Sequence, residues 1–239
     1  GLEKFQEYKS GARGEPAQLL FEGDITDPEF FLHFDEFLQK LSEVEFIGLN
    51  TDGTVNQEGI LNPIKVSKLI FEHPELKEKI ENEQNIKITD INNDKIPDSS
   101  DQIKEVIKYA IRNGLSINNE FSFNPLWVQR YFWYNQETDN EFTAILLFFL
   151  SGSESEDDVK QVREGIAIKI NETNFPKDIE IGVTGSPFSR SDQLNASTDA
   201  MRRSIPIAAA GSFIIILIAL RSFRYALATI IPIGLVVVW

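Results

Sequence analysis

The apolar residues of this chain follow two kinds of pattern. Short runs and helical stripes occupy the first 200 residues, and two long uncharged runs follow, at residues 205–220 and 225–239. A helix that crosses a membrane needs about 20 mostly apolar residues. The residues 221–224 (Arg-Ser-Phe-Arg) join the two runs, and so short a connection forces the second helix to turn back. The pattern predicts a transmembrane helical hairpin in residues 201–239, whose second helix is truncated, as in a piece of a longer membrane protein.

Residues 1–50 show the pattern of a strand, a helix and a second strand. A short apolar run at 18–24 has strand character, and residues 45–50 form another. Between them, Asp27 and Pro28 are the capping residue and first-turn proline typical of a helix start. A phenylalanine-rich stripe at helical spacing follows, and we interpret it as core packing.

Residues 142–200 repeat this order and end in a linker helix. Residues 142–150 predict a strand, Ser155 with Asp158 forms a capping box before a helix, and residues 178–184 alternate as a strand does. The two halves predict an α+β fold in which two βαβ halves share one sheet, of the split ferredoxin-like type.

An insertion, residues 51–141, separates the two halves. It is mostly helical, with predicted helices at 64–82 and 103–113, the second closed by Gly114 at a C-cap position. Aromatic residues are dense between 121 and 134. They are either core or a partner-facing patch, and we favour the core or a subunit contact.

The net charge of −14 reflects an excess of acidic residues. All four basic residues after position 200 are arginines with no acid beside them, so the acidic excess lies in residues 1–200. Because nucleic-acid binding needs clustered Lys and Arg, the charge argues against that partner. The positive-inside rule favours a cytoplasmic hairpin turn at Arg221 and Arg224, but Arg202 and Arg203 then lie at the outer end, which makes the count two against two. The acidic excess of residues 1–200 breaks this tie in favour of an outer location for them. We therefore expect residues 1–200 to be extracytoplasmic.

The clearest local motif is an aspartate-rich stretch at residues 90–101. Its oxygen-bearing side chains have the spacing of a calcium loop, because a calcium ion takes six to eight oxygen ligands. The motif resembles the loops of EF-hand, dockerin and thrombospondin-type repeats, although Lys95 stands where glycine is usual, and Asp101 replaces the longer glutamate. The predicted ligands of a structural Ca²⁺ are Asp90, Asn92, Asp94, the Ile96 carbonyl, Asp98 and Asp101. The alternative is a polar turn that caps the next helix.

Nothing in the sequence predicts catalysis. The only histidines, His33 and His73, are isolated, and the chain has no cysteine. It also has no phosphate-binding glycine loop and no nucleophile elbow. We therefore expect a protein that is not an enzyme and carries no cofactor besides Ca²⁺.

The order of segments after residue 182 carries a family resemblance. A strand ending in Val-Thr-Gly-Ser-Pro is followed by a polar helix at 192–203, the apolar run, Arg-Ser-Phe-Arg, and a helix that contains Pro232. This order resembles the resistance-nodulation-division (RND) superfamily, in particular its MMPL-type branch with the hopanoid exporters. The resemblance implies a porter domain and adjacent membrane helices of an ion-gradient-driven exporter of lipids or hydrophobic molecules. It implies a multi-pass protein of the inner or plasma membrane. Its partners would be membrane lipid, a hydrophobic or lipid substrate, the remainder of the same transporter and further copies of the chain.

Two other functions remain open on the sequence alone. One is the extracytoplasmic sensor domain of a membrane receptor, although the return of the chain into apolar sequence after Arg224 argues against it. The other is a calcium-dependent binding module on a membrane anchor, which rests only on residues 90–101.

Overall fold

The computed structural model describes residues 15–57, 60–117, 121–137, 141–151, 155–221 and 223. The chain divides into two compact units, Gly1–Ser189 and Arg190–Trp239.

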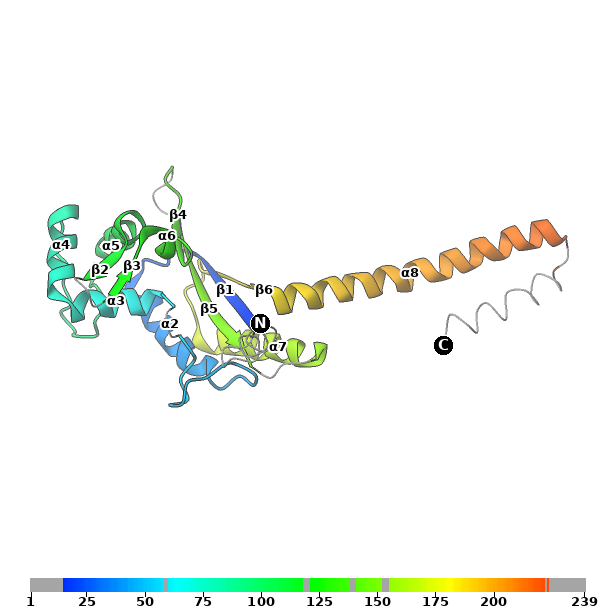
Figure 1. The fold of residues 1–239 in the computed structure, drawn as a ribbon, viewed down its shortest axis with the longest axis horizontal. Helices are drawn as coiled ribbons and strands as arrows, with labels where there is room; N and C mark the ends of the chain where they lie inside the picture. The colour runs from blue at the N-terminus through cyan, green and yellow to red at the C-terminus, as the bar shows by residue number, and fades with distance from the viewer. Residues whose placement is uncertain are drawn as a thin grey trace, which may run out of the picture. The chain divides into compact units, whose positions relative to one another are not determined.

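An antiparallel sheet of four strands organises the first unit, in the order β4-β5-β1-β6 (Figure 1). Its centre is the pair β1 (Glu15–Gly23) and β5 (Phe142–Leu150), which run side by side from Glu15↔Leu150 to Gly23↔Phe142. Strand β6 (Glu180–Gly185) pairs with β1, and β4 (Phe132–Tyr134) pairs with the start of β5. The prediction that both halves of the chain share one sheet is confirmed.

Two helices, α2 and α7, lie against each other, and both contribute side chains to the core. Helix α2 (Pro28–Leu41) begins where the Asp27 carboxylate accepts a hydrogen bond from the Glu29 amide, 2.9 Å away. Helix α7 (Glu156–Thr173) begins with the predicted capping box of Ser155 and Asp158. The alternate residues of β5 from Phe142 to Leu150 are buried, so one face of this strand belongs to the core.

The strand predicted at residues 45–50 does not form. Phe46 has a left-handed backbone (φ 65°), which interrupts an extended strand. Only isolated bridges remain, from Ile47 to Leu150 and from Leu49 to Val55. The edge of β5 that does not pair with β1 is therefore occupied by more than one segment. Strand β4 pairs with its first residues, and Ile47 bridges to its last.

The insertion folds into helices, a hairpin and the edge strand β4. Its elements before β4 are α3 (Pro63–Glu72), α4 (Pro74–Gln84), α5 (Ser100–Asn113), β2 (Leu115–Ile117), β3 (Phe121–Phe123) and α6 (Pro125–Val128). The helix predicted at 64–82 is two helices, because His73 precedes Pro74 and takes a non-helical conformation. Helix α5 ends at Gly114 (φ 75°), as predicted.

The aromatic segment of the insertion is divided between core and surface. Tyr131, Phe132 and Tyr134 are buried, whereas Trp133 is 56% exposed. The prediction of a core role is confirmed for the three buried rings. Phe132 and Tyr134 enter the main sheet through β4, which no pattern in the sequence indicated.

Helix α8 (Ser186–Leu220) makes up almost all of the described part of the second unit. Its first four residues, 186–189, belong to the first unit. The predicted polar helix at 192–203 and the apolar run at 205–220 form one continuous helix with Pro206 inside it. In the part of the chain that the structure describes, no helix is long and apolar enough to cross a membrane. The predicted hairpin is therefore not confirmed, and its second helix at 225–239 lies outside the described residues.

Candidate functional site

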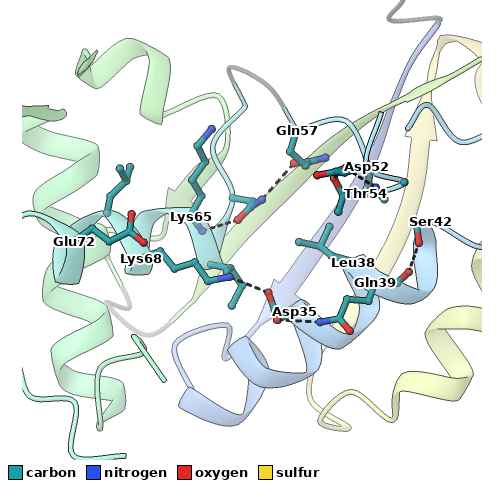
Figure 2. Close-up of a pocket in the computed structure, with 15 residues that line it drawn as sticks. Asp35, Leu38, Gln39, Ser42, Asp52, Thr54, Gln57, Lys65, Lys68 and Glu72 are labelled. Atoms are coloured by element: carbon teal, nitrogen blue, oxygen red, sulfur yellow. Dashed lines mark hydrogen bonds and ion pairs between the residues drawn. The ribbon is translucent and has the colours of Figure 1, made fainter. Parts of the chain in front are cut away.

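A groove of about 610 Å³ lies between α2, α3 and the loop formed by residues 52–57 (Figure 2). Helix α2 follows β1, and α3 belongs to the insertion, so the groove lies where the insertion meets the N-terminal part of the first unit. Its volume is within the range of small-molecule sites, about 300–1,000 Å³.

The lining of the groove has an apolar component from three segments. Leu38 comes from α2, Val55 from the loop, and Ile64 and Leu69 from α3. Ile64 and Val55 are buried, whereas Leu38 and Leu69 are partly buried and pack against the core. Such a surface can take an apolar body by the hydrophobic effect.

An ion pair joins α2 and α3 at the rim of this groove. Lys68 Nζ lies 3.4 Å from Asp35 Oδ1, and Gln39 Nε2 donates to Asp35 Oδ2 at 3.3 Å (Figure 2). Both partners of the ion pair are more than two-fifths exposed. A solvent-exposed pair contributes only about 0–1 kcal/mol. The ion pair therefore links α2 to α3 at the rim of the groove but adds little to the stability of that contact.

A chain of polar side chains connects the groove to the sheet. Gln57 Nε2 donates to the Leu147 carbonyl of β5 at 2.8 Å, and Asn62 Nδ2 donates to Gln57 Oε1 at 3.3 Å. The buried Asn62 also caps α3, because its Oδ1 accepts the Lys65 amide at 2.8 Å. Gln57 thus satisfies part of the β5 edge between β4 and the Ile47 bridge, and ties α3 to the sheet.

The far end of α3 is tied to the aspartate-rich loop. Lys95 Nζ lies 2.7 Å from Glu72 Oε1, and the hydrogen bond from Lys95 holds the pKa of the Glu72 carboxyl below its ordinary value. The Ser67 hydroxyl donates to the Lys95 carbonyl at 2.5 Å. The loop is therefore fixed to one wall of the groove.

Within that loop, the first predicted calcium ligands gather in a single turn. The Asp90 carboxylate accepts the amides of Asp94 (3.0 Å) and Lys95 (2.9 Å). Asp94 accepts the Ile96 amide and the Asn92 side-chain amide, each at 2.8 Å. Lys95 itself has φ 64°, so it makes the left-handed turn that a glycine usually makes in such loops.

The remaining predicted ligands lie differently. Asp98 accepts the Ile91 amide at 3.0 Å and closes the loop. Asp101 lies in the first turn of α5, where it lines a separate hollow with Lys104. Among the described residues, no three or more His, Cys, Asp or Glu side chains are arranged to hold a metal ion. Calcium binding therefore stays a prediction.

The two histidines have structural neighbours. His33 lies 3.6 Å from Glu29 and 3.7 Å from Glu36 on α2 and faces the ring of Phe175. His73 separates α3 from α4. Neither histidine lines the groove. The side chains that do line the groove are of kinds that can bind and orient a molecule.

The groove was not predictable from the sequence. The Asn62-Pro63 helix start was a readable signal for α3. Nothing local indicated that α3 would pack beside α2, because the two helices are separated by the irregular segment that replaces the predicted strand at 45–50.

A comparison with protein families identifies the class to which this chain belongs. The model described as the MMPL family matches residues 91–239, which is more than half of the chain. The chain therefore belongs to the MMPL family of RND-type transporters. The matched range includes β5, α7, β6 and α8, and it begins after α2 and α3. No curated protein matches the chain.

Proposed function

We propose that this chain forms an extracytoplasmic porter domain and adjacent membrane helices of an ion-gradient-driven exporter of lipids or other hydrophobic molecules. The observation that carries the proposal is the match to the MMPL family over residues 91–239, which covers the second βαβ half and the uncharged C-terminal runs. In this proposal the protein is a multi-pass protein of the inner or plasma membrane, with residues 1–200 outside the cytoplasm. Membrane lipid, the remainder of the transporter and further copies of the chain are its proposed partners.

The sheet supports the porter assignment. The order β4-β5-β1-β6 has the arrangement of a split βαβ fold, in which β4 takes the place of the second strand. The groove between α2 and α3 supplies a place for a hydrophobic substrate during its passage, because apolar side chains line it and polar groups surround it.

Photo-crosslinking tests the substrate contact. The full chain in lipid nanodiscs is irradiated with a phospholipid that carries a diazirine in its acyl chain, and the crosslinked peptides are identified by mass spectrometry. We expect crosslinks at the groove, and Leu38→Asp should weaken them by about tenfold, since an apolar contact of leucine size is worth about 1.5–3 kcal/mol.

Leu32→Asp is the matched control, because Leu32 lies on the same helix, is 51% exposed and does not line the groove. Equal crosslinking in Leu38→Asp and Leu32→Asp would contradict a substrate role for the groove.

The topology has its own test. The chain contains no cysteine, so single substitutions report one position each. In intact cells, a membrane-impermeant maleimide should label Glu156→Cys in the soluble part and should leave Ser222→Cys unlabelled until the membrane is permeabilised. The reverse labelling pattern would place residues 1–200 in the cytoplasm.

We also propose a structural calcium ion in the loop at 90–101, favoured by the left-handed conformation of Lys95. Asp90, Asn92, Asp94, the Ile96 carbonyl and Asp98 would hold it, and Asp101 would have to turn toward it. Millimolar Ca²⁺ should raise the melting temperature of the chain by mass action, and Asp94→Ala should abolish that rise. An unchanged melting temperature in wild type leaves only a polar turn before α5.

A further inference from the structure

A second hollow, separate from the groove, lies beside α5 in the insertion and has a volume of about 400 Å³. Three lysines line it: Lys87, Lys104 and Lys108. Two acids, Asp101 and Glu105, also line it, so the hollow carries a net positive charge within a strongly acidic chain.

The lysines are held in place by the fold. Lys104 and Lys108 are one turn apart on α5, so they lie on the same face of the helix. Lys87 lies on a segment that hydrogen bonds hold on both sides of it. Before it, the Ile86 amide donates to the Glu81 carbonyl at 3.1 Å. The amide of Ile88 donates to Glu81 Oε1 at 2.8 Å, and Thr89 exchanges two hydrogen bonds with the Gln102 side chain, at 3.2 and 3.0 Å.

The charges in the hollow are unevenly paired. The Lys108 side chain is only 8% exposed, and its Nζ lies 3.2 Å from Glu105 Oε1. In the described part of the chain, the side chains of Lys87 and the partly buried Lys104 make no hydrogen bond or ion pair. Acids outnumber bases by 37 to 23 in the whole sequence, so carboxylate partners are abundant, and yet these two ammonium groups have none.

This arrangement has an electrostatic cost in the absence of an anion. Like charges at i and i+4 on a helix repel each other, and a partly buried ammonium group without a partner loses hydration. An oxyanion offsets both costs, because it accepts hydrogen bonds from several ammonium groups at once, and such charge-assisted bonds are the strong ones.

We propose that this hollow binds a phosphate-type oxyanion, held by Lys87 and Lys104 with the buried Lys108 behind them. The phosphate is either free in solution or part of a lipid headgroup, since both present the same oxygens. Asp101 opposes the anion and sets a limit on its affinity. The site is independent of the proposed export substrate, because none of its residues lines the groove between α2 and α3.

The test uses the full chain, kept free of calcium so that the loop at 90–101 does not contribute. Its melting temperature is measured during titration with inorganic phosphate against chloride at equal ionic strength. Binding to vesicles of phosphatidylcholine, with and without phosphatidic acid, is measured in parallel. Wild type should respond to phosphate, to phosphatidic acid, or to both, and these outcomes distinguish the free anion from the headgroup.

Two variants make the result specific. Lys104→Gln should weaken the affinity for phosphate or phosphatidic acid by about tenfold, which corresponds to the loss of one charge-assisted hydrogen bond. Asp101→Asn should strengthen it, because the opposing charge is removed. Lys177→Gln is the matched control, because Lys177 is exposed and has no partner among the described residues, but lies outside the hollow. No response in wild type, or equal losses in Lys104→Gln and Lys177→Gln, would overturn the proposal.

Discussion

Helices α2 and α7 lie side by side in the two halves of the fold, yet they are buried to very different extents. Helix α2 buries Phe30, Phe31, Phe34, Phe37 and Leu41, whereas α7, which is longer, buries only Val162, Ile166 and Thr173. Helix α2 also packs beside α3 of the insertion. The apolar stripe of a helix is therefore wider when more elements pack against that helix.

The two helices also make contact in different ways. The rings of α2 surround Phe21 of β1 at centroid distances of 5.2–6.2 Å, together with Phe175 from the segment after α7. Helix α7 instead lies close to Val44, in the segment after α2, through Gly165. A Cβ added there would lie 2.8 Å from Val44 Cγ1. Helix α2 packs through large aromatic side chains, whereas α7 packs closely at Gly165 because glycine has no side chain.

The largest effect should come from the aromatic cluster. Phe34→Ala is expected to lower the free energy of unfolding by about 3–5 kcal/mol, because Phe34 is fully buried and its ring is not replaced. Urea denaturation followed by tryptophan fluorescence measures the change. Leu32→Ala, an exposed position on the same helix, should stay within about 0.5 kcal/mol of wild type. Similar losses in the two variants would refute the difference between the faces of α2.

Helix α7 should respond less strongly. Ile166 is fully buried, and Ile166→Ala is expected to cost about 2–4 kcal/mol in the same measurement. Ile168, two residues further along, is 55% exposed, so Ile168→Ala serves as its control. If Ile166→Ala costs more than Phe34→Ala, the ranking of the two helices is wrong.

Gly165→Ala tests the close approach of α7. Alanine favours a helix over glycine by about 1 kcal/mol, but the added methyl group meets a stiff β-branched side chain, so we expect a net loss of about 1–3 kcal/mol. Val44→Ala should relieve the clash, and the double mutant should be more stable than the sum of the two single effects indicates. Additive effects would mean that the contact with Val44 does not constrain the helix.

The smallest effect concerns an ion pair between α7 and the segment after α2. Lys169 Nζ lies 2.7 Å from Glu43 Oε2; this hydrogen bond lowers the pKa of Glu43 and raises the pKa of Lys169 above its ordinary value of 10.5. The stabilisation by Glu43 is present above its ordinary value of 4.5 and is lost as pH falls through its lowered pKa. The stabilisation by Lys169 is present below 10.5 and is lost as pH rises through its raised pKa.

Melting temperatures measured across pH should show this dependence. Lys169→Gln should flatten the decline at both ends, whereas Lys160→Gln, which removes a more distant pair at 4.0 Å, should leave it unchanged. An identical pH profile for wild type and Lys169→Gln would show that the pair contributes nothing measurable, as many exposed pairs do.

Several elements were predictable because their signals are local. Asp27 with Pro28, Ser155 with Asp158, and Gly114 each mark a helix end through hydrogen bonds or backbone angles that involve only neighbouring residues. The apolar run at 142–150 was predictable as a strand for the same reason, since its composition alone favours the extended conformation.

The candidate sites were less predictable. The turn at residues 90–95 was visible, because aspartate and asparagine organise their own backbone. The lysines of the anion hollow were not, since Lys87 and Lys104 come together only when the segment at 86–89 packs against α5. The groove likewise depends on a contact between α2 and α3 that no local pattern encodes.

The sequence by itself determined where α2 and α7 begin, where α5 ends, the positions of the two long strands of the sheet, and the resemblance to MMPL transporters. Only the tertiary structure decided which segments complete the edge of β5. The strand predicted at 45–50 gives way at the left-handed Phe46, and β4, Gln57 and Ile47 occupy that edge instead. The physical reason is that capping and periodicity are satisfied within a few residues, whereas the pairing of a strand edge is settled among all segments that can reach it.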